Sequence, residues 1–380
     1  MQGASELDAY NMFIIYSIKI VIYFVLIYCV HKTAKTHRNK NKFPGYAIIG
    51  YAILFGIYAI LVGNPVPTSD RYNYGIRFMD PGWNISSESI GLNFLYDVLR
   101  PISLNPDFLF FSVEAIYVAI ALLAYRCYKG ARSESLLFLF SSTFPIFGFM
   151  GLKQAVSQGI ITVVMALYFS LAQERNIAYK FFLDLLMLVL MISAILFHET
   201  SLVVPLILFF TAFWKYKLVR FVGYIAMVSG LLAFGYILNT FLLQVGDISE
   251  ELASQTEHYQ NSDDGFTGSV LTIVKGVPFY IISFIAIRNR RKYVHIIDNY
   301  DKYLFLSLFI SCAVAASAYN YWMFRFAFFF YLPVFVFASE LRFAMYQSGL
   351  SIKWYHWSYV IMLLLSIKEL SQYYFLYGGV

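Results

Sequence analysis

Residues 9–42 read AYNMFIIYSIKIVIYFVLIYCVHKTAKTHRNKNK, an apolar run over 9–30 followed by a strongly basic stretch. A helix needs about 20 apolar residues to cross the hydrocarbon core of a bilayer, and Lys and Arg concentrate in cytoplasmic loops. The stretch therefore predicts a membrane-spanning helix whose C-terminal end lies in the cytoplasm. Because no Lys or Arg precedes the run, we expect it to be retained rather than cleaved as a signal peptide.

The same pattern repeats along the chain. Further apolar runs lie at about 44–63, 107–125, 135–151, 155–172, 180–197, 200–214, 221–243, 269–287, 303–319, 324–341 and 356–375. Most basic residues collect in alternate gaps between the runs, at Lys32, Lys35, Arg38, Lys40, Lys42, Arg126, Lys129, Arg132, Arg175, Lys180, Lys215, Lys217, Arg220, Arg288, Arg290, Arg291, Lys292, Lys302, Arg342 and Lys353. Since alternate gaps face the same side of a membrane, the spacing predicts about 12 transmembrane helices with both termini outside the cytoplasm.

The composition agrees with a membrane protein. The chain is 60% hydrophobic and 13% charged, which is too apolar for a soluble surface. Its net charge of +6 comes mostly from the basic gaps, so it indicates membrane orientation and excludes a nucleic-acid partner. The three cysteines show neither disulfide nor zinc spacing. We predict an all-α polytopic integral membrane protein with a single transmembrane domain over 1–380.

Two long extracytoplasmic loops are expected, at about 64–106 and 244–268. The first has turn residues around short amphipathic pieces, and its stretch 89–99 is expected to lie along the membrane surface. The second carries acidic residues and no Lys or Arg, which predicts a solvated loop.

Some cations do not fit the alternation and are expected on or near the outer face: Arg71, Arg77, Arg100, Lys153 and Arg325. Cations are rare there unless they bind something anionic. Arg71 and Arg77 belong to residues 69–77, SDRYNYGIR, which also contain Asp70 and Tyr74. Guanidinium groups match phosphate oxygens bidentately, and tyrosine rings provide surfaces for stacking sugars. An internally paired structural turn is the alternative.

Lys153, Gln154 and Gln158 open another apolar run at its outer end. The backbone amides of a helix N-terminus attract anions, and residues at i and i+4 share a helix face. Ammonium and amide donors are therefore expected to converge on phosphate or sugar hydroxyls. The alternative is a helix start with a lysine that reaches the interface.

His198 and Glu199 end the run at 180–197, in Phe197-His198-Glu199-Thr200-Ser201. Leu202 stands where a zinc-protease motif needs its second histidine, so no metal site is predicted. An imidazole there is a candidate proton acceptor near neutral pH, and Glu199 competes for the same role. A hydrogen-bonding anchor for the loop is the alternative for His198.

Arg325 opens the run at 324–341, and an arginine within a membrane span marks a functional site by default. Arg325 is therefore expected either to bind an anion or to form a structural pair. Glu114 and Lys19 are similar charges inside predicted spans, and they are expected either to satisfy each other or to line a cavity.

In these four places the chain resembles the EpsG branch of the Wzy-type polysaccharide polymerases. The resemblance is carried by Ser69-Asp70-Arg71-Tyr72-Asn73-Tyr74, by Lys153-Gln154, by Phe197-His198-Glu199-Thr200-Ser201 and by Arg325, in that order and on one predicted face. Lys153 stands where the family usually has Arg. A lysine is a point charge that cannot make the planar fork of an arginine.

The resemblance implies a GT-C-like glycosyltransferase on the outer face of the bacterial cytoplasmic membrane, with no cofactor or metal. Its substrates would be undecaprenyl-diphosphate-linked oligosaccharides, joined into a surface polysaccharide, and its expected partners are a chain-length regulator and a lipid-linked glycan flippase. His198 is the first candidate for the base, followed by Asp70 and Glu199. Arg71, Tyr74, Arg77, Lys153, Gln154, Gln158 and Arg325 would bind the substrate and its diphosphate.

Other functions use similar residues. A polysaccharide ligase or another lipid-linked-sugar transferase needs the same cations and base. A membrane O-acyltransferase also uses an intramembrane histidine but needs no diphosphate site. A flippase or transporter would line a path reachable from both faces, whereas the charges outside the pattern are predicted mostly on one face.

Overall fold

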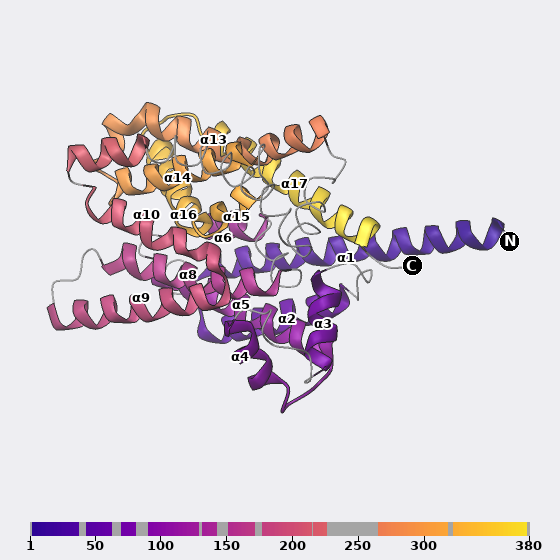
Figure 1. Cartoon of the computed structure of the whole chain (residues 1–380). Coiled ribbons are helices and arrows are strands. Elements are labelled where there is room, and N and C mark those ends of the chain that lie inside the picture. The colour runs from indigo at the N-terminus through magenta and orange to yellow at the C-terminus, as the bar shows by residue number, and fades with distance from the viewer. Residues whose placement is uncertain are drawn as a thin grey trace. The chain divides into compact units, whose positions relative to one another are not determined.

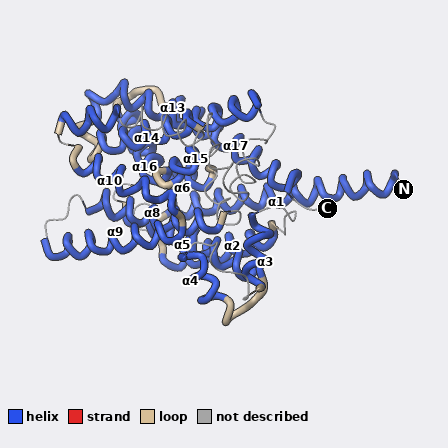
Figure 2. The backbone as a smooth tube through the Cα atoms, viewed as in Figure 1, coloured by secondary structure: helices blue, strands red, loops and turns tan. Residues whose placement is uncertain are grey.

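A computed structural model describes residues 2–37, 43–62, 70–80, 90–128, 131–142, 151–171, 177–214, 216–225, 265–317 and 322–377. Every regular element within these ranges is a helix (Figures 1 and 2), which confirms the all-α prediction. The chain divides into two compact units, unit 1 with Met1–Ser201 and Met362–Val380, and unit 2 with Leu202–Ile361.

Unit 1 contains the longest apolar helices. Four segments are long and apolar enough to cross a membrane: Phe13–Thr36 of α1 (Gln2–Thr36), α5 (Pro106–Cys127), Leu152–Ser170 of α8 (Leu152–Leu171) and α9 (Ile177–Phe197). The shorter α2 (Gly45–Leu61) is equally apolar. The helices α2, α5, α8 and α9 each begin and end within a few residues of a predicted run, because a long apolar run is the strongest signal for a membrane helix. The helix α1 extends beyond the predicted run 9–30 at both ends. The chain is therefore a multi-pass membrane protein.

Some predicted spans differ from the structure. Of the run 135–151, only α6 (Ser133–Phe140) is a described helix, and most of 221–243 and of the loop 244–268 lies outside the described residues. The prediction of one helix over 324–341 is wrong, because the chain forms α15 (Trp322–Phe328) and α16 (Tyr331–Gln347) with a turn between them. Pro333 explains the break, since a proline ring clashes with the carbonyl four residues earlier but fits the first turn of a helix.

Two glycine contacts show that α2 and α5 run antiparallel. A Cβ atom added to Gly56 would lie 2.8 Å from the Phe111 ring, and one added to Gly45 would lie 3.8 Å from Arg126 at the other end of α5. Gly56 therefore permits a close helix approach of the kind that small residues provide in membrane bundles.

By the same reasoning α5 and α8 run parallel. Leu109 near the start of α5 shares a cluster with Leu152 at the start of α8, and a Cβ atom on Gly159 would lie 3.1 Å from Tyr117 further along α5. The C-terminus of α2 and the N-termini of α5 and α8 therefore meet at one end of unit 1, which we call the cluster end. This agrees with the alternating directions predicted from the sequence.

The opposite end of unit 1 carries basic residues of the predicted cytoplasmic gaps, and we call it the basic end. Arg126 lies there beside the start of α2. The Ser170 hydroxyl at the end of α8 donates to the Cys127 carbonyl at the end of α5, at 2.6 Å. The cations of the predicted cytoplasmic gaps thus lie at a different end of unit 1 from Arg71 and Lys153, which fall outside the alternation. This separation is the one that the alternation predicts.

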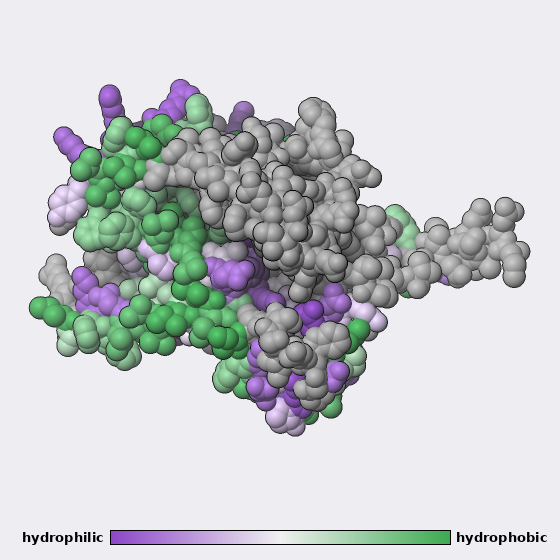
Figure 3. All heavy atoms as spheres, in the orientation of Figure 1, coloured by the Kyte–Doolittle hydropathy of each residue, from purple (hydrophilic) through white to green (hydrophobic). Residues whose placement is uncertain are grey.

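Burial distinguishes the helices of unit 1. Most side chains of α8 are buried and none of those described is exposed, so this helix lies largely inside unit 1. In contrast, α9 exposes Leu185, Leu188, Val189 and Ile192, each about half exposed, in the apolar band that Figure 3 shows in green. A large exposed apolar face in a protein of this composition is a lipid-facing surface.

Unit 2 is packed around α16, whose side chains from Tyr331 to Ser339 are buried. Phe279 of α13 (Gly265–Tyr293) stacks on Tyr331 and on Phe335. The hydroxyl of Ser283 lies 2.6 Å from that of Ser307 in α14 (Tyr300–Ala316). Unit 2 also contains α10 (Val203–Ala212), and α17 (Lys353–Tyr377) continues into unit 1.

Candidate functional site

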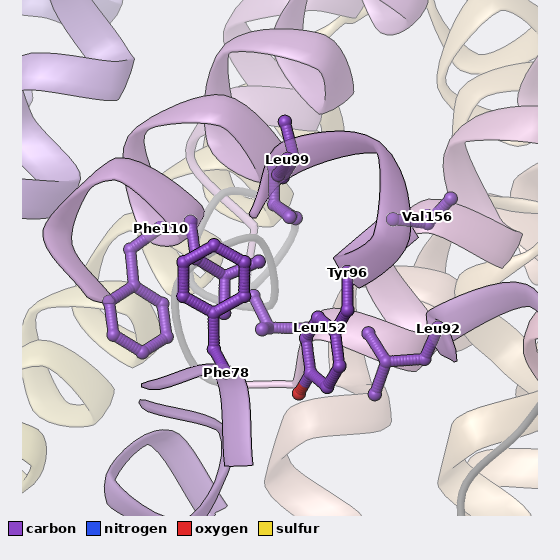
Figure 4. Packing of buried hydrophobic residues seen from close by; sticks show 9 residues of the cluster. Phe78, Leu92, Tyr96, Leu99, Phe110, Leu152 and Val156 are labelled. Carbon is purple, nitrogen blue, oxygen red and sulfur yellow. The ribbon is translucent and has the colours of Figure 1, made fainter. Parts of the chain in front are cut away.

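The cluster end is covered by two short helices from the predicted outer loop, α3 (Asp70–Met79) and α4 (Ile90–Leu99), beside α2 and α5 (Figure 1). The helix α4 covers most of the stretch 89–99, whose position along the membrane surface stays a prediction. Buried apolar residues from α3, α4, α5 and α8 form a single end cluster (Figure 4), made of Phe78, Leu92, Tyr96, Leu99, Leu109, Phe110, Val113, Leu152 and Val156.

The end cluster brings together three motifs that are far apart in the sequence. Tyr74 of α3 and Phe197 of α9 pack against it, and Leu152, which precedes Lys153, belongs to it. A Cβ atom on Gly91 would lie 2.6 Å from the Phe197 ring, so α4 touches the end of α9 directly. The segments 69–77, 153–158 and 197–201 therefore share one end of unit 1.

The helix α3 is amphipathic and presents its candidate residues at different depths. Arg71, Gly75 and Phe78 form its buried face, Tyr72 is exposed, and Tyr74 and Arg77 are partly exposed. A Cβ atom on Gly75 would lie 3.3 Å from Pro106, so the helix rests closely on the start of α5. Arg77 is thus the more accessible of the two arginines.

Arg71 anchors α3 to the bundle. Its side chain is 2% exposed, Nη2 donates to the Ala59 carbonyl at 2.8 Å, and the guanidinium lies 3.8 Å from the centre of the Phe110 ring. Lys19 Nζ donates to the Val62 carbonyl at 3.4 Å. Two cations therefore bind the C-terminal carbonyls of α2, where the helix dipole is negative.

Arg100 also has a structural role. Its guanidinium donates to the carbonyl groups of Arg77, Phe78 and Asp80, at 2.7, 3.1 and 3.3 Å. These carbonyl groups lie at the C-terminal end of α3, which carries partial negative charge. An anionic partner was expected for Arg100, and the end of this helix is that partner. The sequence offers no signal for this contact, because residues 81–89 and the whole of α4 separate α3 from Arg100.

The three polar residues at the start of α8 lie in different environments. Lys153 is partly exposed, whereas Gln154 and Gln158 are 4% and 0% exposed. The backbone carbonyl of Gln158 accepts from the Thr162 hydroxyl at 2.7 Å. The amides thus belong to the interior of the cluster end, and Lys153 is the part of this motif nearest to solvent.

His198 starts the short helix η3 (Glu199–Leu202) that follows α9. Its Nδ1 accepts from the backbone N–H of Thr200 at 3.4 Å and lies 3.1 Å from the Thr200 hydroxyl. A ring nitrogen that accepts from a backbone amide carries no proton, so the neutral imidazole has its proton on Nε2 and donates from there. The neighbouring carboxylate of Glu199 is exposed.

Glu114 was noted in the sequence, but its setting emerges only from the structure. The residue is fully buried in α5, and neither carboxylate oxygen has a hydrogen-bond partner among the residues that the structure describes. Glu114 and Lys19 therefore do not satisfy each other through a hydrogen bond at this carboxylate. Both interact electrostatically with Arg71.

Two further candidates are not members of the end cluster. Asp70 is the first residue of α3, and its side chain lies outside the described part of the structure. Arg325 belongs to α15 in unit 2 and is partly exposed. The residues 318–321 before α15 are also outside the described ranges.

The family comparison covers all of these residues. The model of the EpsG family matches residues 48–377, which include α3, the start of α8, the His198 turn and α15. No curated protein and no solved structure matches the chain. The match extends over most of a chain that is helical and multi-pass, and it shows that the protein belongs to the EpsG family.

Proposed function

We propose that this protein is a glycosyltransferase that joins undecaprenyl-diphosphate-linked oligosaccharides into a surface polysaccharide, on the outer face of the bacterial cytoplasmic membrane. Membership of the EpsG family supports a polysaccharide-polymerase type of function. The observation that carries the finer proposal is the meeting of Arg77, Lys153 and the His198 turn at the end of unit 1 opposite Arg126.

The cluster end has the chemistry that a lipid diphosphate requires. Arg77 and Lys153 are partly exposed cations beside the apolar end cluster, and the buried charge of Arg71 adds positive potential behind them. Cations fixed in a low-dielectric setting stabilise negative charge more strongly than cations in water. The apolar face of α9 offers a surface along which a polyprenyl chain can lie.

In the proposed reaction a hydroxyl of the acceptor oligosaccharide attacks the anomeric carbon of the donor. The hydroxyl proton passes to a carboxylate or imidazole, the new glycosidic bond forms, and the bond between the anomeric carbon and the diphosphate breaks. Undecaprenyl diphosphate leaves with the bonding electron pair. Arg77 and Lys153 offset the charge that grows on the leaving oxygen, which is the usual work of preorganised donors.

For the base, the geometry favours Glu199 over His198. The Nδ1 lone pair of His198 already accepts from Thr200, and Nε2 carries the proton, so the neutral ring is a donor in this arrangement. His198 then orients a substrate oxygen through Nε2, while the exposed Glu199 carboxylate removes the proton. Asp70 is the remaining candidate.

The test is polymer synthesis by purified protein in nanodiscs, with a defined undecaprenyl-diphosphate oligosaccharide and product sizing. We expect a ladder of repeat units from the native protein and a loss of about 100-fold or more in Arg77→Ala and Glu199→Gln. His198→Gln, which keeps a donor near the position of Nε2, should retain more activity than His198→Ala. Lys32→Ala, an exposed cation at the basic end, is the matched control and should change activity less than about twofold.

The products also separate the alternatives. A single transfer to a different acceptor would indicate a ligase, and movement of the intact substrate across the bilayer without new bonds would indicate a flippase. Full activity in stable Arg77→Ala and Glu199→Gln proteins would reject the proposed site.

A further inference from the structure

Lys275 is a cation of unit 2 that none of the four sequence motifs includes. It belongs to α13 and lies inside the apolar run predicted at 269–287. Its side chain is partly exposed. An ionisable residue within a predicted membrane span is a functional hypothesis by default, so the neighbours of Lys275 indicate what it does.

The helices α13 and α14 run antiparallel, which places Lys275 beside the end of α14. The Ser283 and Ser307 hydroxyls lie 2.6 Å apart. Nearer the C-terminus of α13, the Ala286 carbonyl accepts from the Tyr300 hydroxyl at the start of α14, at 2.6 Å. The N-terminal half of α13, which carries Lys275, therefore runs beside the C-terminal end of α14, where the chain continues to α15. We call this end of unit 2 the α15 end.

The next two helices lead away from the α15 end. Phe330, between α15 and α16, meets Phe309 in the middle of α14, with ring centres 5.2 Å apart. Further on, Phe337 of α16 stacks on Tyr303 near the start of α14, at 5.5 Å. In α13 and in α15 alike, the N-terminal residues are therefore those nearest the α15 end.

One aromatic ring brings Lys275 and Arg325 close together. Phe279 stacks on Tyr331 with ring centres 5.0 Å apart, and Phe328 meets the same Tyr331 ring edge-on at 5.3 Å. Lys275 precedes Phe279 by one helical turn, and Arg325 precedes Phe328 in the same way. Two partly exposed cations from different helices thus lie about one turn nearer the α15 end than the Tyr331 ring.

The Tyr280 hydroxyl adds a donor at this end. A Cβ atom added to Gly276 would overlap the Tyr280 ring and hydroxyl, so this side chain turns back along α13 to the residue that follows Lys275. The hydroxyl oxygen is buried and has no hydrogen-bond partner among the residues that the structure describes. A buried hydroxyl without a partner is destabilising, and a ligand that accepts its hydrogen bond would offset that cost.

The donor set and its surroundings indicate the class of ligand. Arginine, lysine and tyrosine side chains all donate to phosphate oxygens. Val274, directly before Lys275, is 38% exposed, so apolar surface adjoins the cations. This combination suits a phosphate group that is attached to an apolar chain. Arg290, in the last turn of α13, belongs to a predicted cytoplasmic gap, so the α15 end is predicted to face outward.

We propose that Lys275, Tyr280 and Arg325 form a binding site for the phosphate group of a membrane lipid at the α15 end of unit 2. Two lipids carry this chemistry. One is the undecaprenyl-diphosphate-linked glycan, whose assignment to the site rests on the proposed function, and the other is an anionic phospholipid of the bilayer. The site itself requires no glycosyl transfer.

Lipid binding to the purified full-length protein tests the site. Undecaprenyl diphosphate, phosphatidylglycerol and inorganic diphosphate are titrated in detergent and followed by native mass spectrometry, which resolves each further bound lipid as a separate step. We expect Lys275→Ala and Arg325→Ala each to weaken binding of one lipid about tenfold. Inorganic diphosphate should bind at least about tenfold more weakly than undecaprenyl diphosphate, because it has no apolar chain. Arg288→Ala removes an exposed cation at the opposite end of α13 and should change affinity less than about twofold.

Tyrosine substitutions separate direct contact from charge. Tyr280→Phe keeps every charge and should weaken lipid binding about threefold. The matched control is Tyr300→Phe, which removes a hydroxyl at the opposite end of unit 2. Because that hydroxyl bonds to Ala286, its loss should lower the melting temperature and leave lipid binding unchanged. Gly276→Ala should weaken binding as Tyr280→Phe does, since the added Cβ atom displaces the Tyr280 ring.

The probe that depends on the site identifies the lipid. Loss confined to undecaprenyl diphosphate assigns the site to the lipid-linked glycan, and an equal loss for phosphatidylglycerol assigns it to the phospholipid. Native affinity of Lys275→Ala and Arg325→Ala for both lipids would overturn the proposal, as would an equally large effect of Arg288→Ala. Since binding is measured without synthesis, a protein that makes no polymer rejects the proposed function and leaves this test intact.

Discussion

At the scale of single residues, the arginines that lie outside the alternating basic gaps of the sequence have different roles in the structure. Arg71 donates to a backbone carbonyl at the C-terminal end of α2 and Arg100 to carbonyls at the C-terminal end of α3, whereas Arg77 stays partly exposed. A helix C-terminus and a diphosphate are both anionic partners for a guanidinium. An arginine outside the basic loops is therefore a candidate for either, and contacts decide between them.

Replacement of Arg100 tests its capping role. Arg100→Ala removes donors to three carbonyls, and each hydrogen bond with a charged partner contributes about 1.5–3 kcal/mol. We expect a clear fall in melting temperature in detergent, with only partial recovery in Arg100→Lys, because an ammonium cannot span the three acceptors. Arg126→Ala, an exposed cation at the basic end, should leave stability nearly unchanged. Equal stability of Arg100→Lys and the native protein would contradict the cap.

Tyr96 provides a pH-dependent test of the end cluster. Burial raises the pKa of its phenol above the ordinary value of 10.0, although Arg77 and Arg100 oppose that shift. Because the folded-state pKa is the higher one, the stabilisation by neutral Tyr96 is fully present below pH about 10 and is lost as pH rises through the folded-state pKa. The native melting temperature should therefore fall more steeply above pH about 10 than that of Tyr96→Phe. Parallel pH profiles would show that ionisation of Tyr96 does not affect stability.

At the scale of elements, the contact between α4 and α9 sets the position of the His198 turn. A Cβ atom on Gly91 would lie 2.6–2.9 Å from three atoms of the Phe197 ring, so even alanine requires one helix to shift. Such overpacking costs about 1–3 kcal/mol. Gly91→Ala should lower both the melting temperature and the polymerisation rate, because Phe197 directly precedes His198.

A second glycine provides the control for this prediction. A Cβ atom on Gly50 in α2 would meet nothing within 4 Å, so Gly50→Ala should be neutral or slightly stabilising. Adding Phe197→Leu to Gly91→Ala should restore part of the stability by making room. Native stability in Gly91→Ala alone would mean that α4 does not rest closely on α9.

At the scale of the whole molecule, the prediction concerns the two ends of unit 1. Tyr72 at the cluster end and Lys180 near the start of α9 are both exposed. With Cys29, Cys127 and Cys312 replaced by Ser, a membrane-impermeant maleimide added to intact cells should label Tyr72→Cys and spare Lys180→Cys. Lysis should make both accessible. Labelling of Lys180→Cys alone would invert the topology and remove the proposed site from the outer face.

The sequence by itself determined the class of the protein and the directions of its main helices. Long apolar runs and alternating basic gaps specify spans locally, so α2, α5, α8 and α9 follow the predicted ranges closely, and α1 contains the whole of the run 9–30. The break between α15 and α16 was missed because apolar residues continue through it, although Pro333 carried the signal. The grouping of the motif segments at 69–77, 153–158 and 197–201 was anticipated from the alternation, since three consecutive outward-facing ends must share a side.

Tertiary structure alone decided what each polar residue does. Gln154 and Gln158 became interior, Arg71 and Arg100 became anchors of α3, and Glu114 became fully buried within α5. These outcomes depend on which carbonyl, ring or charge from a distant segment lies within a few ångströms. The hydrophobic pattern of a membrane span fixes its depth and direction through the bilayer, but the burial of a polar side chain depends on its neighbours, and packing chooses them.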